Sequence, residues 1–413
     1  MTLIAILLLL VFGYSLFSER LERTVLTAPL IFTAAGMMAP MLFPHLAEWQ
    51  GNREVLLWVA EIGLVLLLFT DASRTELGLL KSMRALPVRL LSTGMLLTIF
   101  LGGVIALVIF RQFTLWEAGI LAAILAPTDA GLGQIIVNCP RLPMKIRQAL
   151  NVEAGLNDGL SVPFLLFFIA LGTTDAVGSH SVLAWFMVEQ LGFGTVIGVG
   201  LGLVGGWLLG EATRQKSIAP AFEQLGLVTV PLLCVVASEA AHASMFIAAF
   251  VAGLAVQGGF REAGKHSIDF AESWGQLLNL SIFFLFGLMV ARAWPQFTMA
   301  HVLYAVMSLT NVRMLPVAIA LMGAGLNWAT VLFMGWFGPR GLASIVLGLV
   351  YLEQETRQPA ESTIRLAVMV TVLLSIFAHG LSALPGMSLY AATFSKSEAN
   401  ECEQALAGHN HRS

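Results

Sequence analysis

One acidic residue, Asp158, lies in the middle of an apolar stretch of residues 147–171 that is long enough to cross a membrane. An ionised carboxylate at the centre of a bilayer is costly unless it faces a polar cavity or is neutralised. A proton and a cation can each neutralise it, but not both at once. Asp158 therefore predicts a transport site at which a cation and a proton compete.

The residues around Asp158 divide into two faces of the expected helix, which contains the segment 153–159, EAGLNDG. At 100° per residue, Asn157 lies near Glu153 and on a different face from Asp158. We expect Glu153 to pair with a basic residue inside the protein, with Arg340 as the obvious candidate, because a buried acid and a buried base are each costly alone. Asn157 is equally suited to bracing the helix by a hydrogen bond or to binding an ion.

The composition predicts an all-α integral membrane protein. Of the 413 residues, 57% are hydrophobic and 11% are charged, against roughly 25% charged in a soluble domain. The net charge of -3 gives no reason to expect nucleic acid as a partner. The three cysteines, Cys139, Cys234 and Cys402, show no metal-ligand spacing, so we expect neither disulfides nor a zinc site.

Apolar runs of membrane-spanning length predict about thirteen transmembrane helices in one membrane domain, residues 1–389. A retained first span fits better than a cleaved signal peptide, because no basic region precedes it. The expected spans are 2–17, 25–43, 54–72, 86–110, 114–137, 147–171, 181–210, 223–239, 243–257, 274–292, 298–324, 327–351 and 362–385.

The distribution of basic residues predicts the orientation. Most of the 22 Lys and Arg residues fall in loops on the same side as the C-terminus, and such loops are typically cytoplasmic. We therefore expect an N-terminus outside, a C-terminus inside and a short cytoplasmic tail over residues 390–413. The plasma membrane of a prokaryote is the expected location.

Two expected spans are broken at corresponding places, by residues 126–131 and by residues 337–341. A proline in each break removes an amide donor and leaves helix ends unpaired near the membrane midplane. Asp129 in one break and Arg340 in the other can offset the dipoles of those ends, and Asp129 can equally border the ion path.

The spacing of the breaks predicts an inverted repeat, as in many secondary transporters. We expect two six-helix repeats with crossed, broken helices. Repeat one covers about residues 1–171, a linking helix about 181–210, and repeat two about 223–388.

Four ordered motifs resemble one family of transporters. The segment EAGLNDG is similar to the E-S-G-L-N-D-P signature of NhaP-type sodium/proton antiporters, in the monovalent cation/proton antiporter superfamily. FGPRGLASIVLGL at 337–349 resembles the G-G-x-R-G-A-x-x-x-A-L helix of that branch. LLFTDAS at 67–73 and LAPTDA at 125–130 also match in kind and order.

The resemblance implies an electroneutral exchanger that is not an enzyme and has no cofactor. It implies that Asp158 binds the cation and the proton alternately and that Asn157 replaces the second acid of electrogenic relatives. It also implies that Thr128 and Asp129 border the ion site and that Asp71 contributes to it from the neighbouring domain.

The resemblance further implies the scaffold of the site and its movement. In the family, the residues matching Glu153 and Arg340 form an ion pair. Such proteins are homodimers embedded in lipid, in which a mobile core slides against a dimerisation domain in an elevator-type movement. Here the core corresponds to about residues 86–171 and 298–385.

This chain departs from the family signature at two positions beside Asp158. Ala154 stands where a Ser hydroxyl usually helps to bind the ion, so the choice among Na+, K+ and Li+ is open at this position. Gly159 replaces the usual Pro, from which we expect a local loosening of the helix. We therefore predict Na+/H+ exchange, with Li+ as a second cation and K+/H+ exchange as the alternative.

Two other classes of protein fit the residues poorly. An intramembrane aspartyl protease would need its acids in Y-D and G-x-G-D motifs, which Asp71, Asp129 and Asp158 do not occupy. A cation channel would need a repeated filter or a ring of identical subunits, which a thirteen-span inverted repeat does not suggest.

The substitution Asp158→Asn should abolish cation-driven proton flux, because an amide carries neither the proton nor the charge that binds a cation. The protein should still fold and dimerise. Proton flux in proteoliposomes measures the outcome, and normal flux from this variant would contradict the assignment of Asp158.

Overall fold

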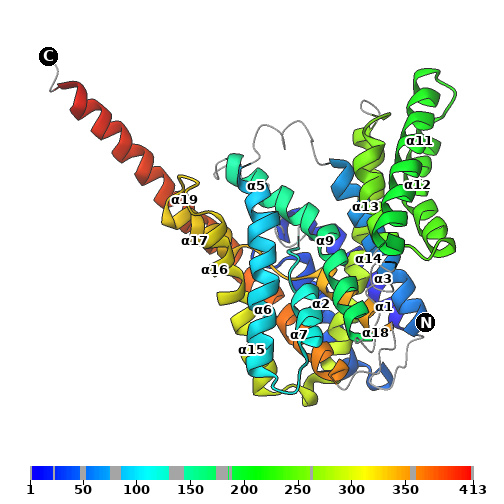
Figure 1. Ribbon diagram of the computed structural model, residues 1–413, viewed down its shortest axis with the longest axis horizontal. Coiled ribbons are helices and arrows are strands. Elements are labelled where there is room, and N and C mark those ends of the chain that lie inside the picture. The colour runs from blue at the N-terminus through cyan, green and yellow to red at the C-terminus, as the bar shows by residue number, and fades with distance from the viewer. Residues whose placement is uncertain are drawn as a thin grey trace.

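The computed structural model describes residues 2–21, 24–46, 53–74, 85–129, 144–173, 185, 188–260, 264–353 and 360–410. Most of these residues lie in helices (Figure 1). The predicted all-α class is confirmed for the part of the chain that the structure describes.

Most helices match one expected span or half of one. In chain order they are α1 (Thr2–Leu21), α2 (Ala28–Leu42), α3 (Arg53–Arg74), α5 (Ala85–Arg89), α6 (Met95–Ile109), α7 (Leu115–Ile124), α9 (Met144–Thr173), α11 (Gly194–Arg214), α12 (Pro220–Ala240), α13 (Met245–Val256), α14 (Gly264–Ala293), α15 (Met299–Leu309), α16 (Asn311–Ala320), α17 (Trp328–Trp336), α18 (Leu342–Glu353) and α19 (Glu361–Asn410). Two π-helical turns, η2 (Leu90–Gly94) and η3 (Val188–Phe193), precede α6 and α11.

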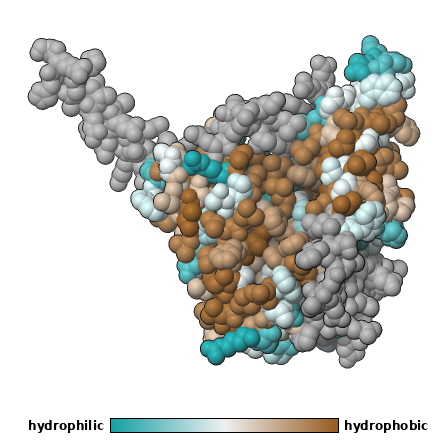
Figure 2. All heavy atoms as spheres, in the orientation of Figure 1, coloured by the Kyte–Doolittle hydropathy of each residue, from teal (hydrophilic) through white to brown (hydrophobic). Residues whose placement is uncertain are grey.

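The described helices are those of an integral membrane protein. Eight of them are long and apolar enough to cross a bilayer, and four shorter apolar helices accompany them, including α7 and α18. Figure 2 shows apolar side chains covering the face between polar ends. Such an exposed apolar surface is expected where lipid, not water, is the solvent.

Three features of the helices differ from the expected spans. The span predicted at 298–324 is interrupted at Thr310, whose backbone angles of φ -102° and ψ -86° lie outside the helical region and separate α15 from α16. The span predicted at 86–110 begins with α5 and the π-helical turn η2. The helix of the span predicted at 362–385 is longer than expected, because α19 continues to Asn410 and extends away from the body (Figure 1).

Small residues bring α11 and α13 unusually close together. Five buried glycines at four-residue spacing line one side of α11: Gly194, Gly198, Gly202, Gly206 and Gly210. A Cβ at Gly202 would lie 2.6 Å from the carbonyl oxygen of Ala252, which is closer than packing allows. Small residues at this spacing let membrane helices pack backbone against backbone, so α11 and α13 form one firmly packed pair.

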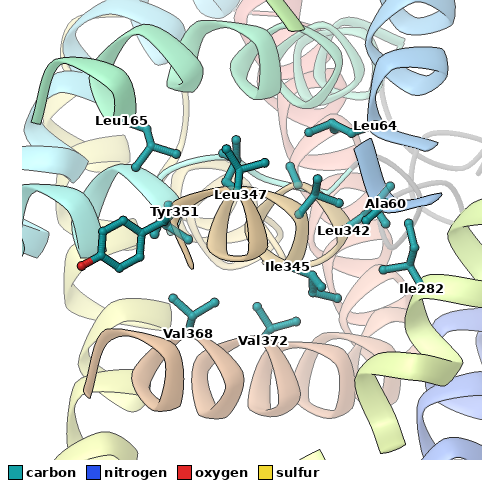
Figure 3. Packing of buried hydrophobic residues seen from close by; sticks show 14 of the residues in the cluster. Ala60, Leu64, Leu165, Ile282, Leu342, Ile345, Leu347, Tyr351, Val368 and Val372 are labelled. Carbon is teal, nitrogen blue, oxygen red and sulfur yellow. The ribbon is translucent and has the colours of Figure 1, made fainter. Parts of the chain in front are cut away.

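Helix α18 lies at the centre of the packed helices. Figure 3 shows its side chains Leu342, Ile345, Leu347 and Tyr351 surrounded by residues of other elements. The surrounding residues are Ala60 and Leu64 of α3, Leu165 of α9, Ile282 of α14, and Val368 and Val372 of α19. All ten of these labelled side chains are buried. The start of α18, which is one end of a helix break, is therefore held inside the protein.

Candidate ion-binding site

The two predicted helix breaks lie against each other. The first follows the end of α7 at Ile124, and the second separates Trp336 of α17 from Leu342 of α18. The amide of Asp129 in the first break donates to the carbonyl of Pro339 in the second at 2.8 Å. A backbone hydrogen bond thus joins two segments more than 200 residues apart in the sequence.

Each break provides hydrogen-bond partners for a helix end beside the other break. Asp129 Oδ2 accepts the amide N–H of Leu342, the first residue of α18, at 2.6 Å. Arg340 Nη1 donates to the carbonyls of Ala126 and Pro127, just past α7, at 2.7 and 2.9 Å. Helix N-termini carry partial positive charge and C-termini partial negative charge, so an acid and a base are each placed where they stabilise the ends. The expected role in offsetting helix dipoles fits both residues.

Two glycines in the second break allow charged side chains to approach the backbone. A Cβ at Gly341 would overlap the carboxylate of Asp129, and a Cβ at Gly338 would overlap the guanidinium of Arg313. Any larger residue at either position would have to displace a charged group from the crossing, which is the place where the two breaks meet.

The ion pair predicted between Glu153 and Arg340 is wrong. Glu153 instead pairs with Arg313 of α16 in a two-pronged contact, with Nη1 to Oε1 at 2.5 Å and Nη2 to Oε2 at 3.0 Å. Both side chains are buried. Arg340 instead directs its Nη1 atom to the carbonyls of Ala126 and Pro127 past α7.

Asp158 is a buried acid beside the place where the two breaks meet. It is 3% exposed, and its Oδ1 atom has no hydrogen-bond partner among the described residues. Asp129, Asp71 and Arg340 all interact with it electrostatically. Since Arg313 is paired with Glu153, the site favours an added positive charge at Asp158.

Asn157 connects the helix of Asp158 to the first break. Its Nδ2 atom donates to Thr128 Oγ1 at 2.6 Å, and both side chains are buried. The amide oxygen Oδ1 has no hydrogen-bond partner among the described residues. Asn157 is therefore a brace in this structure, and its oxygen is still able to accept an ion or a proton donor.

Two glycines of α9 pack directly against residues of other helices. A Cβ at Gly155 would lie 3.5 Å from Cβ of Asp71, in the last turn of α3. Asp71 therefore packs against α9 about one helical turn before Asp158. A Cβ at Gly159 would lie 2.6 Å from the ring of Phe250 on α13. The ring occupies the space beside Gly159, and α9 continues through this position as a regular helix.

All predicted site residues lie around the middle of α9 and the crossing, but the sequence reading missed some functional contacts. The pairing of Arg313 with Glu153 and the contact of Phe250 with Gly159 were not predicted from the sequence. Buried Glu117 was also missed, although Thr114 and Glu117 have capping-box spacing and form that box at the start of α7.

In the described residues, the segment after α7 lies across the break between α17 and α18, beside a buried acid. This arrangement in a helical membrane protein resembles the architecture of secondary transporters. The chain belongs to the family described as "Sodium/hydrogen exchanger, transmembrane", whose profile matches residues 6–387.

Several known proteins are similar in sequence to this chain. A K(+)/H(+) antiporter NhaP2 of Shewanella sp. (strain MR-4) is 26% identical over 376 residues, which are 88% of this chain and 62% of the relative. A probable Na(+)/H(+) antiporter of Schizosaccharomyces pombe is 26% identical over 258 residues, 57% of this chain and 33% of the relative. The chain thus spans less than two thirds of the length of these relatives.

The fold is also that of a solved antiporter. The sodium proton antiporter MjNhaP1 of Methanocaldococcus jannaschii matches with a TM-score of 0.70 and 20% sequence identity, covering 92% of this chain and 99% of that chain. The expected antiporter fold is confirmed.

Neutralising one member of the buried ion pair should strongly destabilise the protein. Arg313→Gln leaves Glu153 without its partner, and breaking a buried pair typically costs about 3–5 kcal/mol. The double variant Glu153→Gln/Arg313→Gln should lose much less, because no lone charge is left. The thermal unfolding midpoint in detergent measures these changes. If Glu153→Gln/Arg340→Gln had a higher unfolding midpoint than Glu153→Gln/Arg313→Gln, the pairing seen here would be wrong.

A methyl group at Gly159 should clash with Phe250. Gly159→Ala should cost about 1–3 kcal/mol by overpacking, and Phe250→Ala in the same chain should relieve part of that loss. The two substitutions should therefore couple by about 1 kcal/mol when unfolding midpoints are compared in a double-mutant cycle. Gly200→Ala is the matched control, since a Cβ there meets nothing within 4 Å. Strictly additive losses would exclude the contact.

Proposed function

We propose that the protein is an antiporter that exchanges a monovalent cation for a proton, and that the two compete for Asp158. The observation that carries this proposal is the buried Asp158 Oδ1 atom, which has no hydrogen-bond partner among the described residues. The other buried acids of the crossing, Asp129 and Glu153, accept hydrogen bonds from the scaffold. A carboxylate kept out of water in this way requires a proton or a cation.

The exchange follows from competition at one carboxylate. A bound cation leaves when a proton arrives, and a cation returns when the proton is lost. Asp158 is neutralised in both forms, which lowers the cost of carrying the site through the low-dielectric part of the membrane. One cation exchanged for one proton moves no net charge, so we propose an electroneutral cycle.

K+ is our first candidate for the cation, in preference to the Na+ that we expected from the sequence. The Shewanella relative is named a K(+)/H(+) antiporter. The buried Ala154 also offers no side-chain oxygen to replace the water that an ion loses, and K+ holds its water less tightly than Na+. Na+ is the second candidate, because the family is described as sodium/hydrogen exchangers and the fungal relative is named for Na+.

We further propose that the site moves as part of a core against a dimerisation domain. The crossing ties α7, α9 and α16–α18 together through hydrogen bonds, which supports a mobile core over about residues 86–171 and 298–385. The close α11–α13 pair supports a rigid remainder. The proposed assembly is a homodimer with the C-terminus inside the cell.

The proposal predicts cation-coupled proton flux in proteoliposomes after a pH jump, tested side by side with K+, Na+ and Li+. A pH difference of one unit stores about 1.4 kcal/mol and should support at most about a tenfold cation gradient. The rate should not change when the membrane potential is clamped. Lowering the pH on both sides should raise the apparent KM for the cation, because protons then occupy Asp158.

The liposome experiment separates the alternatives. Flux with K+ that exceeds flux with Na+ supports the first candidate, and the reverse order supports the second. A rate that follows the clamped potential would contradict electroneutral exchange, and cation flux without counter-movement of protons would indicate a channel. Empty liposomes and liposomes with the Asp158→Asn variant are the controls.

A further inference from the structure

His379 of α19 lies beside the second helix break, and together with Ser375 it contacts both sides of the break. Its Nε2 atom is 2.9 Å from the carbonyl oxygen of Trp336, the last residue of α17. Its Nδ1 atom is 3.1 Å from Ser375 Oγ, and Ser375 Oγ accepts the amide N–H of Arg340 at 2.6 Å. His379 and Ser375 together therefore bridge the gap between α17 and α18.

The acceptors around His379 constrain the direction of its hydrogen bonds. The carbonyl of Trp336 can only accept, so His379 Nε2 carries a hydrogen. Nδ1 lies 3.1 Å from Ser375 Oγ and 3.0 Å from the Ser375 carbonyl oxygen. In the neutral ring Nδ1 then has no hydrogen, so it accepts the hydroxyl hydrogen of Ser375 and only touches the carbonyl. With the ring in this form, the bonds run from the Arg340 amide to Ser375, from Ser375 to His379, and from His379 to Trp336.

Both ends of the break need partners from outside their own helices. The carbonyls at the end of α17 and the amides before α18 have no partner within a helix, and a buried backbone group without a partner is costly. Helix α19 supplies the acceptor for the Arg340 amide and a second donor for the Trp336 carbonyl, which also accepts the amide N–H of Gly338 at 2.9 Å. The Trp336 ring also lies 5.0 Å from the His379 ring between centroids, and Trp336 Nε1 donates to Ser382 of α19 at 3.0 Å.

The second break in turn holds the residues beside Asp158. Arg340 binds the carbonyls of Ala126 and Pro127, and the amide and carboxylate of Asp129 bind the second break at Pro339 and Leu342. A shift of residues 339–342, which include the Arg340 amide bound by Ser375, would therefore shift Asp129. It would also shift Thr128, which Asn157 binds next to Asp158.

We propose that His379 and Ser375 are positioning residues for the ion site. They set the separation of α17 and α18, and through Arg340 and Asp129 they set the first break relative to Asp158. His379 does not carry the transported proton in this scheme, because both of its ring nitrogens are engaged by the scaffold. The inference rests on the proposed function, because the KM for the transported cation is the quantity that tests it.

The test compares His379→Phe, His379→Gln and Ser375→Ala with the unaltered protein in proteoliposomes. Phe keeps a ring against Trp336 but removes both hydrogen bonds, whereas the Gln amide can still donate to Trp336. Ser375→Ala removes the link to Arg340 without altering the ring. Ser388→Ala is the matched control, because Ser388 is an exposed serine of α19 that bonds only its own helix, at Leu384.

We expect His379→Phe and Ser375→Ala to raise the KM for the cation about tenfold, as loss of outer support does at ion sites, with a smaller change in kcat. His379→Gln should recover most of that loss, and Ser388→Ala should change nothing. The unfolding midpoint in detergent is recorded for each variant, so that KM is compared among folded proteins.

An unchanged KM in folded His379→Phe and Ser375→Ala would overturn the positioning role. If His379→Phe does not fold, Ser375→Ala alone decides, since it leaves the ring in place. A lower unfolding midpoint with unchanged KM would also overturn the proposal, because it would show a purely structural role. Absence of exchange by the unaltered protein would instead overturn the proposed function.

Discussion

The structure depends on the need to satisfy broken helix ends inside a membrane. Neither lipid nor protein interior can hydrate the free carbonyls past α7 or the free amides at the start of α18. The chain meets this need by crossing the two breaks, so that Arg340 binds carbonyls of the first and Asp129 binds an amide of the second. Arg340 and Asp129, the charged residues of the two breaks, thereby hold the two breaks together.

This use of charge explains why one acid is left for transport. Glu153 is neutralised by Arg313, and Asp129 and Arg340 bind helix ends at the crossing. Asp158 lies beside these groups, buried and without a hydrogen bond to its Oδ1 atom among the described residues. The same interactions that hold the two breaks together therefore leave Asp158 to be neutralised by what the protein carries.

The sequence was sufficient for local features and insufficient for distant pairings. Apolar runs located most spans, and the prolines at 127 and 339 marked the breaks because proline removes an amide donor. The pairing of Glu153 was mispredicted because it depends on the interruption at Thr310, which starts α16 and places Arg313 in its first turn. No proline or glycine marks that interruption. The contact of Phe250 with Gly159 joins two helices far apart in sequence, so no local pattern could reveal it.

The most direct test of the central claim is to count protons released when a cation binds to the purified protein in weakly buffered detergent solution. If the cation and the proton compete for Asp158, binding should release up to one proton per cation, and more at a pH where the carboxyl is protonated than where it is ionised. Cation binding that releases no proton at any pH would contradict the account.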